Sequence, residues 1–348
     1  MIVIIQNTIK ILLIFITTLL LSCSNDDNNP TVSESSVPEL ATVTIITITS
    51  STANFGGNIT SDGGETVTAS GVCWSTSQTP TVSDNTTNDW DGTDNFTSKI
   101  SGLTPETIYY VRTYAINSVG TGYGSTISFT TFEMGKGTVT DIDGNLYKVV
   151  KIGNQWWMAE NLKVTHYRNG ATIPNVTDDT EWSNRETGSY CNYGNNTNFV
   201  NTYGRLYNWY AVDDSRDIAP KGWHVPVDEE WKELEIFLGM GSGEVNIRGW
   251  RGTDEGGKMK ESGTTHWISP NTGATNETGF TALPGGGRSS MENFEGDFVN
   301  NTLQASFWSS SDESSSQAWF RYLSYTHSDV RMNSISKRQG FSIRCVMD

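Results

Sequence analysis

The chain is poor in cysteine, histidine and basic residues, and each shortage excludes a class of protein. Only four cysteines occur in 348 residues, which is too few for a disulfide scaffold. The four histidines are at least 42 residues apart, so no local metal-binding motif is present. Lys and Arg number 23 against 39 Asp and Glu, and the net charge of -16 argues against nucleic acid or an anionic lipid surface as a partner of the protein body.

Catalytic signatures are also missing. No GxSxG nucleophile elbow occurs. The segment GTDEGGKM resembles a P-loop but ends in Met259 where Ser or Thr is needed to hold Mg²⁺. The sequence therefore predicts a protein that is not an enzyme.

Long hydrophobic runs are confined to the start of the chain. Residues 11–21 are almost entirely apolar, follow Lys10, and end two residues before Cys23. The run is too short for the roughly 20 residues of a transmembrane helix, and is typical of a secretory signal. The LLSC sequence around Cys23 resembles the lipobox of bacterial lipoproteins, in which the chain is cleaved before the cysteine and the cysteine is lipidated.

The resemblance to lipoproteins implies a definite location. Residues 1–22 would be removed as a signal peptide, Cys23 would carry the lipid, and residues 23–39 would form a polar, disordered tether. The acidic residues after the cysteine resemble the surface-export signal of Bacteroidetes lipoproteins. We expect an exported protein, anchored to the bacterial outer membrane by lipid alone and exposed at the cell surface.

Short alternating apolar and polar segments separated by Gly, Asp and Pro fill residues 40–132. This pattern predicts a β-sandwich of about seven strands. The segment LTPETIYYVRTYAINSVG resembles the F-strand region of fibronectin type III domains, in which the hydroxyl of Tyr109 would bond to the backbone at the E–F corner. Cys73 and Trp74, on another predicted strand, are expected to be buried.

Residues 134–348 have a different composition, since ten of the twelve tryptophans lie between Trp156 and Trp319. The segment TDIDGNLYKVVKIGNQWWMAENL predicts a hairpin that turns at Asp143 and Gly144, with Leu146, Val149 and Ile152 facing inward. Helical spacing of apolar residues predicts helices over 203–212 and 227–239. The second helix lacks a Ser or Thr N-cap at Val227, which should weaken it by about 1 kcal/mol unless Asp228 takes over.

The order of motifs in this half resembles the Fibrobacter succinogenes major paralogous domain. The matching segments are TDIDGNLYKVVKIGNQWWMAENL, YGRLYNWYAV, GWHVPVDEEW, GTTHWISPNTGATNETGFTALPGGGR, FWSSS and GFSIRC, within residues 137–348. GWHVPVDEEWKELE and GFSIRC also resemble C-type-lectin-like and formylglycine-generating-enzyme-like folds. These resemblances imply a mainly β chain: a fibronectin type III-like sandwich, then an α+β domain of two helices and a twisted antiparallel sheet, with function carried by loops. The cysteine pair that formylglycine-generating oxidases use is absent.

A few residues of this half are candidates for a site. Asp141, Asp143 and Asn145 alternate like the start of a calcium loop, although a tight hairpin turn is the favoured explanation of the same residues. No cofactor is expected unless these residues bind calcium. Trp250 and Trp267 lie in polar loops, where they could contact a ligand or join the core. Cys191 and Cys345 could form a disulfide in an oxidising compartment or remain buried thiols.

The sequence thus predicts a surface-anchored protein with a binding or structural role, whose partner is a glycan or another surface protein. A surface enzyme acting on polysaccharide or protein stays open as the alternative, with Asp254, Glu255, Glu261 and His266 as its candidate residues. A pair of carboxylates or a Cys/His pair that converges in one cleft would favour the enzyme, and a shallow aromatic shelf would favour binding.

Overall fold

The computed structural model describes residues 34–90, 94–290 and 296–348. Cys23, the predicted signal peptide and residues 23–33 of the predicted tether lie outside these ranges. In the part that is described, no helix has the length and apolar character needed to cross a membrane. Strands greatly outnumber helices, which confirms the mainly β prediction.

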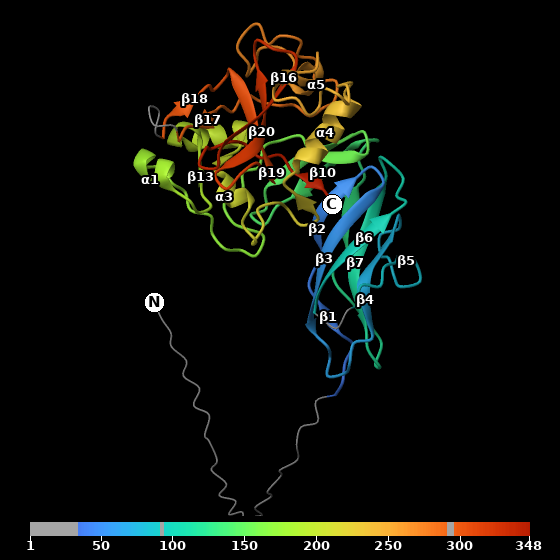
Figure 1. Ribbon diagram of the computed structural model, residues 1–348. Coiled ribbons are helices and arrows are strands. Elements are labelled where there is room, and N and C mark those ends of the chain that lie inside the picture. Colours follow the sequence, from blue (N-terminus) through green and yellow to red (C-terminus); the bar gives the residue numbers. More distant parts are fainter. Residues whose placement is uncertain (1–33, 91–93, 291–295) are drawn as a thin grey trace, which may run out of the picture. The chain divides into compact units, whose positions relative to one another are not determined.

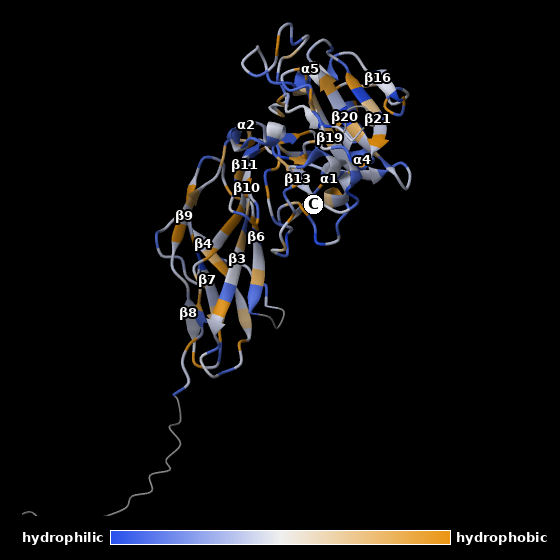
Figure 2. Cartoon of the chain, turned by 90° about the vertical axis from the view of Figure 1, so that its left-hand side faces the viewer, coloured by the Kyte–Doolittle hydropathy of each residue, from blue (hydrophilic) through white to orange (hydrophobic). Residues whose placement is uncertain are grey.

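The first module is a β-sandwich of two antiparallel sheets (Figure 1). One sheet has the order β1-β3-β2 with β6 on β3, and the other has β5-β4-β7-β8 with β9 on β7. Buried apolar side chains from the strands of both sheets form one core cluster between the sheets. Figure 2 shows hydrophobic and hydrophilic residues along the same strands. The strands are β1 (Glu39–Leu40), β2 (Thr44–Thr49), β3 (Thr52–Ser61), β4 (Ala69–Ser75), β5 (Asn85–Thr86), β6 (Asn95–Ser101), β7 (Ile108–Ile116), β8 (Thr121–Tyr123) and β9 (Ile127–Thr130).

Tyr109 closes the corner before β7, as predicted. Its hydroxyl accepts a hydrogen bond from the backbone N–H of Thr104 at 3.1 Å, and its ring stacks on Phe129 with centroids 5.8 Å apart. Cys73 is fully buried and Trp74 is half-buried against the same core. The residues singled out in this module therefore stabilise the sandwich.

The predicted hairpin is present and continues a sheet that begins in the sandwich. Strand β10 (Lys136–Thr140) pairs with β2 on one side and with β11 (Leu146–Ile152) on the other. Strands β12 (Gln155–Met158), β22 (Val346–Met347) and β15 (Trp223–His224) complete the sheet. The predicted inward position of Leu146 is wrong: Leu146 is 58% exposed, and Tyr147, opposite Val139, is buried instead.

A second, four-stranded antiparallel sheet carries the rest of the C-terminal domain. Its order is β16 (Gly249–Arg251), β21 (Val330–Ser336), β20 (Gln317–Ser324) and β19 (Gln304–Asp312). Two short ribbons accompany it, β13 (Tyr190–Cys191) with β14 (Leu206–Tyr207), and β17 (Gly287–Arg288) with β18 (Phe298–Val299). Long loops join these elements (Figure 1).

Of the two predicted helices, only the second is continuous. Helix α4 (Asp228–Phe237) confirms it. The predicted helix over 203–212 is wrong, because Gly204 has a φ of 71° and the following residues pair as β14, which leaves one turn, α3 (Trp209–Val212). The remaining helices are also short: α1 (Asp179–Asn184), η1 (Tyr193–Asn195), η2 (Thr197–Phe199), α2 (Val200–Tyr203) and α5 (Glu255–Met259).

The start of α4 is capped by residues other than Asp228. The Glu230 carboxylate accepts from the backbone N–H of Val227 at 2.9 Å. The Ser311 hydroxyl on β19 accepts from the backbone N–H of Asp228 at 3.0 Å. A side chain from the neighbouring sheet thus supplies the cap that Val227 lacks.

A buried ionic cluster attaches α4 to one face of the four-stranded sheet. Arg321 on β20 donates to Asp228 and to Glu235 on α4, at 2.7 Å each. Arg251 on β16 donates to the other oxygen of Glu235 at 2.5 Å. Trp231 and Leu234 of the helix pack beside the cluster in an apolar core. Both arginines and Glu235 are almost completely inaccessible to solvent.

We expect Arg321→Met to lower the free energy of unfolding by about 3 kcal/mol, because it removes the buried cation that Asp228 and Glu235 share and leaves each of them with one counter-charge, Lys232 and Arg251 respectively. Denaturant unfolding measures this change. Lys136→Met is the control, since Lys136 and its partner Glu133 are both exposed, and should cost less than about 1 kcal/mol. Equal effects of the two substitutions would contradict a stabilising role for the cluster.

Candidate functional site

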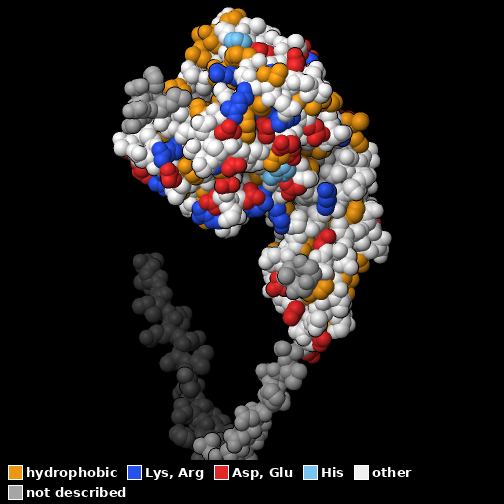
Figure 3. Space-filling view, in the orientation of Figure 1, with side chains coloured by type: hydrophobic (Ala, Val, Ile, Leu, Met, Phe, Trp, Pro, Cys, Tyr) orange, Lys and Arg blue, Asp and Glu red, His pale blue; other side chains and the backbone are white. Residues whose placement is uncertain are grey.

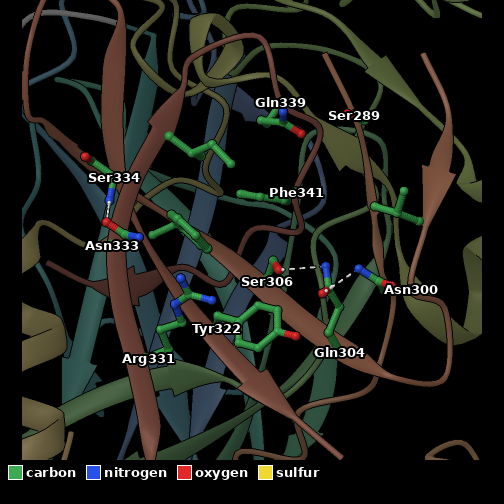
Figure 4. A pocket seen from close by; sticks show the side chains of 13 residues that line it. Ser289, Asn300, Gln304, Ser306, Tyr322, Arg331, Asn333, Ser334, Gln339 and Phe341 are labelled. Carbon is green, nitrogen blue, oxygen red and sulfur yellow. Dashed lines mark hydrogen bonds between the residues drawn. The ribbon is translucent and has the colours of Figure 1, made fainter. Parts of the chain in front are cut away.

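The other face of the four-stranded sheet carries a pocket of about 650 Å³. Strands β19, β20 and β21 form its floor, and residues near β17, β18 and the C-terminal segment form its walls. Figure 4 shows the side chains that line it. The described lining residues are Ser289, Val299, Asn300, Gln304, Ser306, Phe320, Tyr322, Arg331, Asn333, Ser334, Ile335, Gln339 and Phe341.

Strand register places a row of four side chains across this face. Trp250 on β16 lies opposite Arg331 on β21, Arg331 lies opposite Tyr322 on β20, and Tyr322 lies opposite Ser306 on β19. The Trp250 ring meets Tyr322 edge-on, with centroids 5.4 Å apart, and stacks on His327 at 3.8 Å. The row therefore combines aromatic surface with a cation and a hydroxyl.

Amide and hydroxyl groups supply most of the pocket's polarity. Asn300 donates to the Gln304 carbonyl oxygen at 2.8 Å, and Gln304 donates to Ser306 at 3.4 Å (Figure 4). The Asn333 oxygen accepts from the backbone N–H of Ser334 at 2.9 Å, and the Asn333 amino group has no partner among the described residues. These bonds hold the amides in place and leave donors for a ligand.

No carboxylate belongs to the part of the lining that the structure describes. This is unusual in a chain with 39 acidic residues. Figure 3 shows acidic and basic side chains mixed over the visible face of the C-terminal domain. The only charged group among the described lining residues is the guanidinium of Arg331.

Burial raises the pKa of the Tyr322 hydroxyl above its usual value of 10, and nearby Ser324 and Arg331 oppose the shift only in part. The hydroxyl is therefore protonated at neutral pH and is available as a hydrogen-bond donor.

Sequence reasoning missed the pocket residues on β19, β20 and β21. The signal that could have found some of them is the alternation in AWFRYLS, which places Phe320 and Tyr322 on one face of a strand. Sequence reasoning had no means of finding that this face is left open while the other is covered by α4.

The two candidate tryptophans have different environments. Trp250 is half-buried at the edge of the pocket face, so it remains a candidate ligand contact. Trp267 is only 1% exposed and donates to the Ala282 carbonyl at 2.9 Å. The prediction of Trp267 as a ligand contact is wrong, because its loop folds over the core beneath α4.

The candidate calcium residues form a tight turn. One Asp141 oxygen accepts from the backbone N–H groups of Asp143 and Asn145, at 2.9 Å each. The other accepts from Asn145 at 2.8 Å and from the Tyr147 hydroxyl at 2.6 Å. Asp143 bonds to Thr165 and His166. Among the described residues no cluster of three or more metal-ligating side chains occurs, so the geometry does not favour calcium here.

The predicted disulfide between Cys191 and Cys345 is not formed. Both thiols are free and fully buried, and they belong to different apolar clusters. Burial raises the pKa of Cys191 to about 12 and that of Cys345 well above its usual value. Both cysteines therefore pack as small apolar side chains.

A second pocket, of about 690 Å³, contains two of the four residues proposed for an enzyme. The His266 ring nitrogen Nδ1 lies 2.8 Å from the Glu261 carboxylate, and Glu160 also lines this pocket. Asp254 and Glu255 lie elsewhere: Asp254 pairs with Lys258, and buried Glu255 accepts from backbone N–H groups of its own loop. The predicted constellation is thus divided, and the structure places no Ser, Thr or Cys in hydrogen-bond contact with His266 among the described residues.

The motifs of the C-terminal domain have a counterpart in a known family. The Fibrobacter succinogenes major domain family matches residues 150–347, more than half of the chain. The chain belongs to this family. Its pocket, its buried ionic cluster and α4 all lie within the matched residues.

Comparison with other proteins adds little about function. No curated protein matches the sequence. Among solved structures, the chicken CNTN1 FN1–FN3 domains match with 17% identity and a TM-score of 0.24, over 28% of this chain and 32% of that one. The sensor domain of the anti-sigma factor RsgI4 from Pseudobacteroides cellulosolvens matches with 18% identity and a TM-score of 0.21, over 28% of this chain and 98% of that one.

The fibronectin type-III domain of human fibronectin type III domain containing protein 3 matches with 19% identity and a TM-score of 0.21, over 29% of this chain and 92% of that one. The chain spans about a third of the chicken segment. No function is transferred from these structures.

His224, at the edge of the domain's first sheet, supplies a pH-dependent contact. Its ring lies 2.8 Å from Glu230 and 2.7 Å from Asp348, and these carboxylates raise its pKa from 6.5 to about 9. Because the pKa is higher in the folded state, the stabilisation is fully present below about pH 6.5 and is lost as pH rises through about 9.

We expect His224→Gln to lower the free energy of unfolding at pH 6 and to have less effect at pH 9.5. Urea unfolding of the native protein and of the variant at both pH values measures the difference. An effect of the same size at both pH values would show that the charge on His224 contributes nothing.

Proposed function

We propose that this protein is an exported, lipid-anchored, non-catalytic binding protein whose C-terminal domain holds a carbohydrate in the pocket on β19, β20 and β21. The observation that carries the proposal is the pocket's lining: aromatic rings, amides, hydroxyls and one arginine, with no carboxylate among the described residues. We also propose a C-type-lectin-like fold for the domain, but a fold does not imply a function, so the proposal of binding rests on the pocket alone.

The chemistry of this lining suits a sugar. A sugar ring has apolar C–H faces that pack on aromatic side chains such as Tyr322. Its hydroxyl groups both donate and accept, and Asn and Gln side chains do the same in a fixed geometry. The volume of about 650 Å³ lies inside the range of roughly 300–1,000 Å³ found for small-molecule pockets.

The structural features that would support a hydrolase are weaker than those that support sugar binding. The His266–Glu261 pair could orient a base, but the described residues place no nucleophile against it and only Glu160 as a further carboxylate in its pocket. A surface protein as the partner would need a larger complementary surface than a pocket of this size. We therefore favour glycan binding. Hydrolase activity and the binding of a surface protein are kept as alternative outcomes of the test.

The anchor is tested separately from the ligand. We expect Cys23→Ala to move the protein from the membrane fraction to the soluble exported fraction, because Cys23 is the only proposed site of lipid attachment. Immunoblots of fractionated cells and metabolic labelling with a fatty-acid analogue measure this. Unchanged membrane retention would contradict the lipid anchor and leave the pocket proposal untouched.

Binding is tested on an oligosaccharide array with the exported chain, residues 24–348. We expect selective retention of glycans and a loss of about tenfold in affinity for Tyr322→Ala, because the variant removes the central aromatic ring. Phe237→Ala is the matched control, since Phe237 is 62% exposed on α4 and does not line the pocket. Thermal unfolding of each variant separates loss of binding from loss of fold.

Three results would oppose the proposal. One is retention of no glycan, another is equal effects of the two substitutions, and the third is capture of a surface protein that Tyr322→Ala does not weaken. Release of reducing ends from a bound glycan, abolished by His266→Gln, would instead support the enzyme.

A further inference from the structure

Arg331 is the least satisfied arginine on the pocket face. Its guanidinium makes no hydrogen bond or ion pair within the described residues, and its Nε atom is buried without an acceptor. Arg331 as a whole is half-buried. Two arginines that are fully buried elsewhere in the domain have their donors engaged: Arg321 bonds to two carboxylates, and Arg344 bonds to three backbone carbonyls and the Asn161 oxygen. A buried donor without a partner is costly, so an unpaired guanidinium in a pocket indicates a missing acceptor.

The surroundings of Arg331 favour a negatively charged acceptor. The described lining contributes no acidic group to neutralise it. Its register neighbours, Trp250 and Tyr322, place aromatic rings on both sides. Figure 4 shows the guanidinium beside the Tyr322 ring, with Gln304 and Asn300 on the opposite side of the pocket. A ligand in the pocket would thus meet a cation on one side and neutral amides on the other.

We propose that Arg331 binds the carboxylate of an acidic saccharide, such as a uronic acid unit, whose ring lies over Tyr322. The inference rests on the proposed glycan-binding function and names its ligand class. A guanidinium matches the planar carboxylate with two parallel N–H bonds. The amides of Asn300, Gln304 and Asn333 are then left to bond with the sugar's hydroxyl groups.

Array binding with matched ligands tests this inference. The probes are oligogalacturonate, hyaluronan oligosaccharides and other uronate oligosaccharides, their carboxyl-methyl esters, sulfated neutral oligosaccharides and unmodified neutral oligosaccharides. We expect the uronates to bind, and esterification to weaken binding at least tenfold, because the ester removes the charge and keeps the ring. Raising the salt concentration should weaken uronate binding more than any binding of neutral sugars.

Protein variants complete the test. Arg331→Gln should reduce uronate affinity at least tenfold and abolish the difference in affinity between acid and ester. Arg331→Lys should keep part of the native uronate affinity, because lysine supplies the positive charge without the paired N–H donors. Arg216→Gln is the charge-matched control, because Arg216 is an exposed residue paired with Asp214 outside the pocket. It should leave binding unchanged.

The outcomes separate this inference from the function on which it rests. If the native protein bound the uronates and their esters equally, Arg331 would have no role in recognising the carboxylate. The same would follow if Arg331→Gln bound uronates as tightly as the native protein. In both cases the proposal of glycan binding would stand. Binding to sulfated but not to uronate probes would contradict the proposal that Arg331 recognises a carboxylate. Retention of no probe at all would overturn both proposals. Thermal unfolding confirms that each variant is folded.

Discussion

Buried guanidinium groups are the interaction on which the C-terminal domain depends. Long irregular segments leave carbonyl groups that no strand or helix satisfies, and an arginine offers five donors in a fixed geometry. Arg344 bonds to the carbonyls of Met158, Phe280 and Thr281. Arg288 bonds to Val176, Thr177 and Gly296. Arg321 instead binds the carboxylates that attach α4 to the sheet. Each arginine joins segments far apart in sequence, so loops that lack their own regular hydrogen bonds are fixed against the two sheets.

The four-stranded sheet serves two roles because alternate side chains of the same strands point to opposite faces. On β20, Arg321 faces the helix and Tyr322 faces the pocket. On β21, Val330 and Met332 are buried, whereas Arg331 and Asn333 line the pocket. The ionic cluster on the covered face holds the strands in position. Since the open face is formed by the same strands, its side chains are held in position too. A ligand site on such a floor is preorganised, which reduces the entropy lost on binding.

The pocket on the sheet and the pocket beside His266 differ in chemistry. The pocket on the sheet offers fixed amides, rings and an unpaired guanidinium, which recognise shape and charge. The pocket beside His266 gathers carboxylates and lysines, but His266 is bound by Glu261 alone among the described side chains that could activate it. We therefore propose recognition, and not catalysis, as the role of the domain. A lipid at Cys23, a tether and a β-sandwich would then serve to display this pocket.

Features under local control could be predicted from the amino-acid sequence. Alternation and turn residues predict the hairpin at Gly144, apolar spacing predicts α4, and the pattern around Tyr109 predicts the corner of the sandwich. Contacts between distant segments were needed to show that Trp267 is core and Trp250 is not, that Cys191 and Cys345 lie apart, and that residues 203–212 bend at Gly204. The pocket belongs to the second group, because Gln304, Tyr322 and Arg331 come from three strands whose pairing depends on contacts between distant segments. Local periodicity determines which residues share a face, and only packing between distant segments determines which face is covered.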